Sequence, residues 1–512
     1  MVQPMPDVQG TYLLAGRRSE VIRLANIDAD ITQKNPRQLL ARIPGLFVYD
    51  MDGTGNQMNV ATRGLDPHRS WEINLRQNGV VVNSDMYGYP ASHYSPPAES
   101  IERIEFVRGT ASLQYGAQFG GMLNAITKQA DTTRRFGFES INSVGSFGLR
   151  STYNAVSGRT GRLTYYGYAY RRHSDGYRQF SRSDAQAQCA RLQYRANTRL
   201  SLTAELGRSV YVYQIPGPLT DAMFAADPRQ ATRTRNYFNP DIWLPSLRLD
   251  WQISPKTRLQ WVTSAVLGAR NSVQIDAFAT VTDLPDPDAG PPKTGQYRQR
   301  QVDIDNFNSY TSEARLLHSF RVKTIPVTAV GGIQFMHNDL HRRQLGKGTT
   351  GSDFDLSLTA PFGRDLWYHT RNVAAFAEAQ FRLTPRLTVS PGIRVENGVT
   401  QMRGTISYYD PGNLPNDIAH RFALLGVSGQ YRISEQVRLY GGWSQAYRPV
   451  LFKDIIPASV YERADKNLKD ATGYNAELGL EAYWQGIHLN ISAFDLLYRN
   501  RMGTLVLTET PA

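Results

Sequence analysis

Cysteine is almost absent from this sequence of 512 residues, which contains Cys189 alone. A single cysteine excludes disulfide bonds within the chain and zinc sites built from several thiolates. Long apolar runs are absent as well. No stretch reaches the roughly 18 consecutive apolar residues that a membrane-spanning helix needs, and the mean hydropathy is -0.43. A helical membrane protein is therefore excluded.

Motifs of the common enzyme classes are missing too. The sequence has no glycine-rich phosphate loop, no G-x-S-x-G nucleophile turn and no H-E-x-x-H zinc pair. We therefore expect no catalysed reaction, no catalytic residues and no resident metal. The N-terminus, MVQPMPDVQGTYLLAGRRSE, lacks the apolar core of a secretion signal. We expect either that a signal peptide has been removed or that the sequence is a fragment.

Positive charge exceeds negative charge. The chain has 57 Lys and Arg against 45 Asp and Glu, a formal net charge of +12 at pH 7. Such a balance suits nucleic acid, anionic lipid or an anionic ligand. The basic residues are scattered, and the densest groups are the doublets Arg171-Arg172 and Arg342-Arg343. This pattern favours a phosphate-rich lipid surface and an anionic cargo, and we expect no nucleic-acid partner.

Beyond Asp131 the sequence alternates apolar and polar residues with a period of two. In NVAAFAEAQFRL one face carries Val373, Ala375 and Phe381, while the other carries Glu378 and other polar residues. Such alternation predicts strands with one apolar face. Transmembrane barrels and soluble sandwiches share it, and the connections between strands distinguish the two. The 28 Tyr, 20 Phe and 7 Trp fit the aromatic girdles of a barrel.

The connections alternate strictly between short and long. Short ones fall near residues 158–161, 197–198, 254–256, 324–326, 384–386, 434–436 and 485–486, and long ones near 173–185, 214–243, 271–300, 339–368, 400–417 and 447–471. Short periplasmic turns and long external loops are typical of outer-membrane barrels. Counting from Phe136 gives about 15 strands. A barrel with a plugged lumen has about 22, so we expect about seven strands to be missing.

The N-terminal quarter has a different texture, with mixed short strands and one helix. Asn35 is a suitable N-cap, Pro36 occupies the first helical position, and Pro44-Gly45 ends the helix. The dipeptide Asn78-Gly79 predicts a type I′ hairpin turn. These helix and turn signals are typical of a small soluble domain.

The stretch IERIEFVRGTASLQYGAQFGGMLNAITK, residues 101–128, closely resembles the end of the plug domain of TonB-dependent outer-membrane receptors. Two later segments resemble barrel segments of the same family: GGWSQAYRPVLFKD and KNLKDATGYNAELGLEAYWQGIHLNISAFDLLYRNRMGTL. Within the family, the plug sequence is most similar to the ferric dicitrate and siderophore branch. The resemblance implies a mixed α/β plug over residues 1–130. An incomplete antiparallel transmembrane β-barrel follows over 131–512.

The resemblance also implies a function: active uptake of a ferric chelate, either ferric citrate or a ferric siderophore, across the bacterial outer membrane. TonB and its inner-membrane complex would supply the energy, outer-membrane lipid would surround the wall, and iron would be carried within the cargo with no resident cofactor. Uptake of cobalamin, a nickel chelate or an oligosaccharide by the same machinery remains open. So do a passive pore, which the plug argues against, and a surface-binding adhesion barrel.

Two plug arginines are predicted to lock the plug to the wall. Arg63 and Arg108 each precede a glycine at the end of a plug strand, and the family resemblance implies pairing with glutamates that face the lumen. By alternation, the wall partners are expected among Glu378, Glu396 and Glu477. A charge-assisted pair in a confined site holds its geometry well.

The outward loops of the plug are predicted to contact the cargo. The segment from Ser84 to Ser95 is rich in aromatic residues and histidine, which suit a pocket for a bulky chelate. Arg69 is expected to pair with carboxylates of the cargo. The predicted ligand-binding residues are Arg69, Tyr87, Tyr89, His93 and Tyr94.

Overall fold

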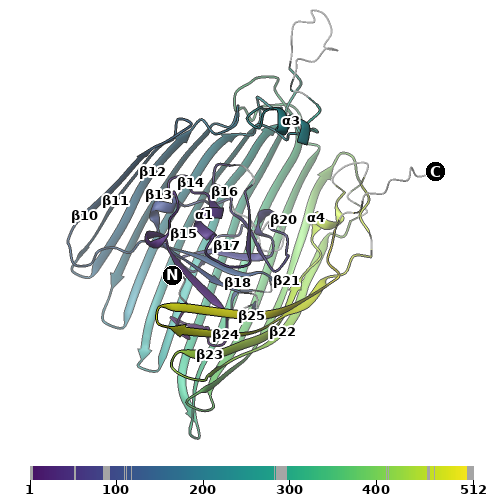
Figure 1. The fold of residues 1–512 in the computed structure, drawn as a ribbon. Coiled ribbons are helices and arrows are strands. Elements are labelled where there is room, and N and C mark those ends of the chain that lie inside the picture. Colours follow the sequence, from purple (N-terminus) through teal and green to yellow (C-terminus); the bar gives the residue numbers. More distant parts are fainter. Residues whose placement is uncertain are drawn as a thin grey trace, which may run out of the picture.

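The structure is a computed structural model. It describes residues 4–50, 53–84, 93–108, 110, 112–116, 118–281, 283, 297–410, 412, 414–457, 462–465, 467–503 and 505. A curved wall of long strands surrounds a small N-terminal domain, whose elements are drawn in purple inside the wall (Figure 1). Among the described residues, no helix has both the length and the apolar character needed to cross a membrane.

The wall is one antiparallel sheet whose strands pair in sequence order. Its strands are β10 (Gly137–Val144), β11 (Arg150–Thr160), β12 (Leu163–Ser174), β13 (Ser183–Arg195), β14 (Leu200–Gln214), β15 (Tyr237–Ser254), β16 (Thr257–Gln274), β17 (Gln301–Val322), β18 (Ile325–Gly348), β20 (Arg364–Arg382), β21 (Leu387–Ile406), β22 (Asp417–Arg432), β23 (Val437–Arg448), β24 (Ala471–Trp484) and β25 (Ile487–Arg499). The short β19 (Leu358–Ala360) pairs with β18 beside this path. The path from β10 to β25 thus confirms the expected count of about 15 strands.

The strand ends also match the expected connections. Every predicted short turn joins two neighbouring wall strands at one end of the sheet, and the long loops lie at the other end (Figure 1). Two of these loops carry helices, α3 (Asp221–Ala226) and α4 (Phe452–Ile455). Among the described residues, β10 and β25 form the two ends of the path and do not pair with each other.

The plug contains a five-stranded sheet in the order β3-β8-β9-β6-β7 and two small hairpins, β1-β2 and β4-β5. Its elements are β1 (Val8–Gln9), β2 (Tyr12–Leu13), β3 (Ser19–Arg23), η1 (Leu24–Asn26), α1 (Pro36–Leu40), β4 (Leu46–Tyr49), β5 (Asn59–Thr62), η2 (His68–Ser70), β6 (Ile73–Gln77), β7 (Val80–Val81), η3 (Ala98–Ser100), β8 (Ile101–Val107), α2 (Ser112–Tyr115) and β9 (Gly121–Thr127). The mixed α/β plug followed by an antiparallel barrel wall is therefore confirmed.

Local sequence explains much of the plug. The Asn35 side chain accepts a hydrogen bond from the backbone N–H of Arg37 and caps α1, as expected. Asn78 and Gly79 both have positive φ, 51° and 81°, which a type I′ turn requires. The apolar faces of β3, β8 and β9 pack on α1 around Ile104 and Phe106, which are 1% and 0% exposed.

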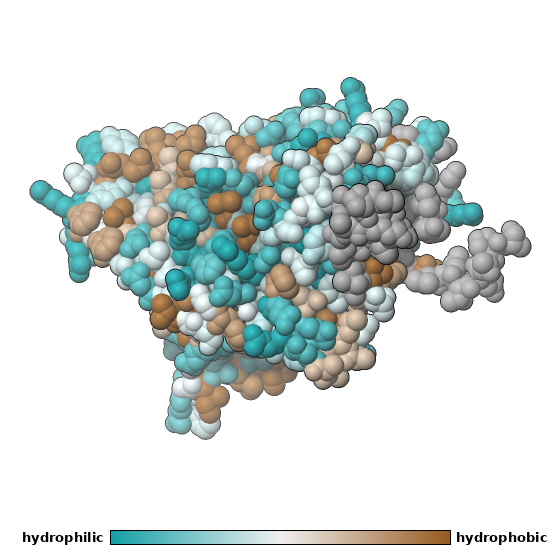
Figure 2. Space-filling model, turned by 90° about the horizontal axis from the view of Figure 1, so that it is seen from above, coloured by the Kyte–Doolittle hydropathy of each residue, from teal (hydrophilic) through white to brown (hydrophobic). Residues whose placement is uncertain are grey.

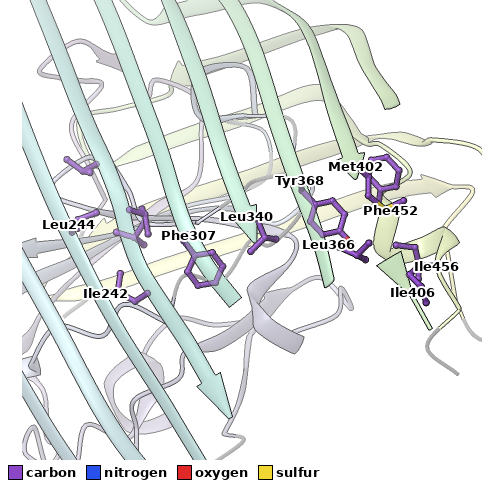
Figure 3. Packing of buried hydrophobic residues seen from close by; sticks show 13 residues of the cluster. Ile242, Leu244, Phe307, Leu340, Leu366, Tyr368, Met402, Ile406, Phe452 and Ile456 are labelled. Atoms are coloured by element: carbon purple, nitrogen blue, oxygen red, sulfur yellow. The ribbon is translucent and has the colours of Figure 1, made fainter. Parts of the chain in front are cut away.

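A second apolar cluster lines the inner face of the wall (Figure 3). Phe307, Leu340 and Leu366 project from neighbouring strands, and Phe452 of α4 packs against them. Val80 of the plug belongs to the same cluster. The loop that carries α4 therefore folds inward and connects the wall to the plug by apolar contact.

The outer face of the wall is apolar over its middle. Alternate residues such as Val373, Ile393 and Leu425 are exposed, while the residues between them face the plug. Seen from above, hydrophilic residues fill much of the centre, and several hydrophobic groups lie toward the rim (Figure 2).

Candidate functional site

Arg63 connects the plug to β24 through a buried ion pair. It follows β5 with φ +56°, and its Nη2 lies 2.5 Å from Glu477 Oε2, with both side chains 2% exposed. Its Nη1 donates to Asn475 Oδ1 at 3.1 Å. Burial lowers the pKa of Arg63, and Glu477 opposes this shift. The structure thus forms one of the expected contacts between plug and wall.

A second buried ion pair joins the plug to β20, and the sequence did not reveal its plug member. Arg17 Nη2 lies 2.6 Å from Glu378 Oε2, with side chains 2% and 1% exposed. Gln114 Nε2 donates to the same oxygen at 3.0 Å. Glu378 is therefore a wall partner as expected, but of Arg17. Arg63 and Arg108 were predicted from the glycine that follows each of them. In Arg17 the neighbouring glycine, Gly16, comes before the arginine, so the same pattern did not include it.

The expected pairing of Arg108 with a wall glutamate is corrected. Its Nη2 lies 2.8 Å from Glu20 Oε1 within the plug, and it also donates to the Pro44 carbonyl at 2.6 Å. Because β3 pairs with β8, Glu20 lies opposite Phe106, two residues before Arg108. This arginine therefore ties the plug sheet to the end of the α1 segment.

The expected role of Glu396 is corrected as well. Its Oε1 lies 2.5 Å from Arg394 Nε on the same strand, with both side chains almost fully buried. Arg394 in turn donates from Nη1 to the Leu113 carbonyl of α2 at 3.3 Å. Glu396 thus pairs with an arginine of the wall and not with Arg63 or Arg108, because residues two apart on a strand share one face.

Further polar contacts surround the plug. Glu205 of β14 accepts from Gln77 and Asn78 at 3.2 and 3.0 Å and pairs with Arg191 at 2.7 Å. On another side, Arg432 lies 3.0 Å from Asp7 near the short turns. The plug is thus held by charged and polar groups on several separate wall strands.

Three of the predicted ligand-binding residues meet at one cavity. Arg69, His93 and Tyr94 line a space that Lys34 and Gln77 also border. Tyr87 and Tyr89, which the sequence also indicated, lie outside the described residues.

The histidine of this cavity is buried and uncharged at neutral pH. Burial, followed by the charge of Arg69, holds the pKa of His93 well below its usual range. Its ring packs edge-on against Phe238 of β15, with centroids 5.2 Å apart. His93 therefore offers an aromatic and polar surface to a ligand, and the positive charge comes from Arg69 and Lys34.

Lys453 of α4 places a cation next to Trp71 of the plug, and the sequence did not predict this contact. Its Nζ lies 3.2 Å from the centroid of the Trp71 ring and 3.8 Å from Asp454. Burial, with Asp454 opposing and Arg448 and Arg69 assisting, lowers the pKa of Lys453 to about 8. Lys453 lies in the loop between β23 and β24, where the sequence has no alternating pattern that could indicate its position. Its contact with the plug therefore becomes visible only in the tertiary structure.

The buried ion pairs between the N-terminal domain and the surrounding wall agree with the family comparison. A model of the TonB-dependent receptor β-barrel matches residues 226–511, and a model of the TonB-dependent receptor plug domain matches residues 16–122. The chain belongs to the TonB-dependent receptor family. The matched families are receptor families and not enzyme families, and barrels of this kind are outer-membrane proteins.

Solved receptors share the fold of this family member. The unliganded ferric citrate transporter FecA has a TM-score of 0.79 at 18% identity, covering 94% of this chain and 70% of that one. The ferric-catecholate import receptor Fiu of Escherichia coli K12, in its closed form, has a TM-score of 0.68 at 14% identity, covering 96% of this chain and 76% of that one. The ferric yersiniabactin receptor FyuA of Yersinia pestis has a TM-score of 0.65 at 16% identity, over 94% and 72%.

Curated relatives match over a shorter length. The vitamin B12 transporter BtuB of Vibrio vulnificus is 29% identical over 101 residues, or 20% of this chain and 16% of that protein. The ferric enterobactin receptor of Pseudomonas aeruginosa is 30% identical over 115 residues, or 20% and 15%. These matches span less than a fifth of each relative.

Within the part of the chain that the structure describes, no group of three or more His, Cys, Asp or Glu side chains is arranged to hold a metal ion.

Proposed function

We propose that this receptor imports a ferric chelate across the outer membrane with energy delivered through TonB. The observation that carries the proposal is the docking of the plug on the inner face of the wall. The plug lies inside the wall (Figure 1) and is tied to it by the buried pairs Arg17–Glu378 and Arg63–Glu477. In a closed barrel of this family, cargo would pass only if these contacts changed, and such a change requires work on the plug. A plug held by buried ion pairs argues against a passive pore, which needs an open path for its solutes.

The charge around the top of the plug supports an anionic cargo. Arg69 and Lys34 border the cavity that His93 and Tyr94 line, and Lys453 lies close enough to Arg69 for their charges to interact. Guanidinium groups bind carboxylates in two-point geometry. Ferric citrate and carboxylate siderophores therefore suit this site, with iron carried inside the cargo and no resident cofactor.

Uptake by cells tests this proposal. A strain that lacks its other ferric-chelate receptors should grow on ferric citrate or a carboxylate siderophore when the protein is expressed, and only if TonB is present. An Arg69→Ala variant should bind the chelate about tenfold or more weakly, because a charge-assisted hydrogen bond is worth about 1.5–3 kcal/mol. Growth without TonB would contradict active transport, and unchanged affinity of Arg69→Ala would remove this residue from the site.

Cobalamin is the second candidate cargo. It is favoured by the matches to vitamin B12 transporters. Cobalamin is not a multiply charged carboxylate, so an Arg69→Ala change would leave its binding nearly intact. Competition between labelled cobalamin and ferric citrate for the purified protein distinguishes the two.

A further inference from the structure

The cavity of the proposed cargo site extends into the apolar core of the plug. Its volume is about 90 Å³, and every described residue that lines it belongs to the plug. Most of the lining surface is apolar, and it includes Leu39 of α1, Ile104 of β8 and Leu123 of β9. These three residues belong to the apolar cluster of the plug and are between 1% and 3% exposed. The cavity is therefore a gap in the packing between α1 and the five-stranded sheet.

A gap of this size is unusual in a protein core. Interiors contain few voids larger than one water molecule, and an empty void leaves the atoms that line it without contacts on one side. A cavity of about 150 Å³ lined by Leu, Ile and Phe stays dry and holds a benzene molecule. A cavity of about 90 Å³ therefore suits a chain of about four carbon atoms.

Polar groups border the same cavity. Besides Arg69 and Lys34, they include Asn59, which is 1% exposed. Its Oδ1 accepts a hydrogen bond from the backbone N–H of Arg69 at 2.8 Å, which fixes the orientation of the amide. Its Nδ2 is buried and has no hydrogen-bond partner among the described residues. Since buried donors are normally satisfied, this amide suits a ligand that brings a carbonyl oxygen.

The side of the cavity next to the wall is held in place by β14. The backbone N–H of Ser95 donates to Ser209 Oγ at 3.3 Å, and the Ser209 hydroxyl donates to the Ser95 carbonyl at 3.0 Å. Gln57 Nε2 donates to Tyr213 Oη at 2.7 Å. Because Ser95 and Gln57 both line the cavity, these contacts keep it formed, as is usual for ligand pockets.

We propose that this cavity accepts a short apolar chain of the cargo, joined to the chelate through a carbonyl group. The inference rests on the proposed import of an anionic ferric chelate. It narrows the cargo to amphiphilic carboxylate chelates, in which a citrate-like group carries an alkyl or acyl chain. The carboxylates bind at Arg69 and Lys34, the carbonyl oxygen accepts from Asn59 Nδ2, and the chain packs against Leu39 and Leu123.

A series of citrate esters tests the proposal. The probes are the ferric complexes of monomethyl, monobutyl and monooctyl citrate, which have the same charge and the same ester carbonyl. Their binding to the refolded full chain is followed by quenching of intrinsic fluorescence. Since each buried methylene strengthens binding about fourfold, the butyl ester should bind about sixtyfold more tightly than the methyl ester. The octyl ester should bind no more tightly than the butyl ester, because the cavity is then full.

Two matched variants show whether the chain enters this cavity. Ala125 of β9 lines the cavity, so the larger side chain of Ala125→Leu should fill it and make the methyl and butyl esters bind equally. Ala41→Leu is the control, because Ala41 is exposed after α1 and should keep the difference between the esters. Circular dichroism and the gel shift on heating check that both variants are folded.

Xenon gives a measurement on the unchanged protein. It occupies dry apolar cavities, so crystals under xenon pressure should show it beside Leu39 and Leu123. A cavity without xenon, equal binding of methyl and butyl esters, or binding that still rises with the octyl ester in both variants would overturn this inference and leave import of an anionic chelate standing. If none of the citrate complexes binds, the proposed cargo is wrong and this inference fails with it.

Discussion

At the scale of single residues, buried charges define how the plug sits in the wall. Arg63 and Glu477 are both 2% exposed and 2.5 Å apart. A buried ion pair gains little net stability over an apolar contact, but removing one partner leaves an uncompensated charge. We therefore interpret these pairs as devices that fix position, since a plug displaced by one residue would leave its arginines unpaired.

Replacing the wall partner of Arg63 should be costly. We predict that Glu477→Gln lowers the free energy of unfolding of the docked plug by about 3–5 kcal/mol, because Arg63 and the nearby Arg18 lose their carboxylate. Denaturant titration followed by hydrogen exchange of plug amides measures the effect. The control is Glu102→Gln, whose partner Arg23 is 51% exposed, and which should cost less than about 1 kcal/mol. Similar costs for both variants would contradict the role of burial.

Lys453 should make the α4 loop sensitive to pH. Its pKa is lowered to about 8 from 10.5, chiefly by burial. Below pH 8 the lysine is protonated in both the docked and undocked loop. Between pH 8 and 10.5 only the undocked loop keeps the proton, so docking strengthens as pH rises, by on the order of 3 kcal/mol.

The measurement is protection of the α4 loop from protease between pH 7 and 10. Lys453→Met keeps the apolar stem above Trp71 and removes the titrating group, so its protection should change less with pH than that of the unchanged protein. Parallel pH profiles for the two proteins would show that Lys453 does not control docking.

At the scale of elements, close backbone contacts seal the plug against the wall. A Cβ atom on Gly16 would lie 2.4 Å from the backbone N and O of Gly429 in β22. Gly16 also has φ +76°, which side chains disfavour. The segment between β2 and β3 therefore touches the wall at a point where only glycine fits.

Gly16→Ala should displace this segment. We expect a loss of about 2–4 kcal/mol in plug docking, from backbone strain of about 1–2 kcal/mol and the collision with Gly429. Gly10→Ala is the matched control, because Gly10 has φ +61° with nothing within 4 Å of its Cβ position. It should show the strain alone. Thermal unfolding in detergent compares them, and equal losses would rule out the contact with Gly429.

Elements with local signals were predictable from the sequence. The helix after Asn35 and the turn at Asn78-Gly79 follow from capping and turn chemistry, and the wall strands follow from alternation. The short helix α2 was not expected, because Ser112–Tyr115 lies among glycines in a stretch that read as a turn. Its Leu113 packs against Leu424 and Tyr447 of the wall, so tertiary contacts support it.

At the scale of the whole molecule, the separate anchors act together. Arg17 is paired on β20 and Arg63 on β24, so the two anchors share no partner. Contributions from such separate sites add. The plug is therefore held by ion pairs at several separate places on the wall. A force that frees the plug must break these ion pairs, either one after another or together.

Removing both anchors should free the plug from the wall. We predict that the double variant Arg17→Ala and Arg63→Ala raises the undocked fraction of the plug, measured by hydrogen exchange of plug amides, by about a hundredfold or more, since each change leaves a buried carboxylate and 1.4 kcal/mol corresponds to tenfold. The matched control replaces Arg23 and Arg42, whose ion pairs lie at the surface of the plug. Equal exchange in the double variant and this control would show that the ion pairs do not hold the plug.

The sequence by itself determined the strands of the wall, because alternation and loop lengths are local properties of the chain, and it indicated the plug and the family through the resemblance of residues 101–128 and of later segments. The same resemblance implied that arginines of the plug would meet glutamates of the wall. Only the tertiary structure decided the partners: Arg63 with Glu477, Arg17 with Glu378, and Arg108 with Glu20 inside the plug. These pairs join residues as far as 414 positions apart, and their choice depends on how the plug is oriented within the curved sheet, which no local pattern encodes.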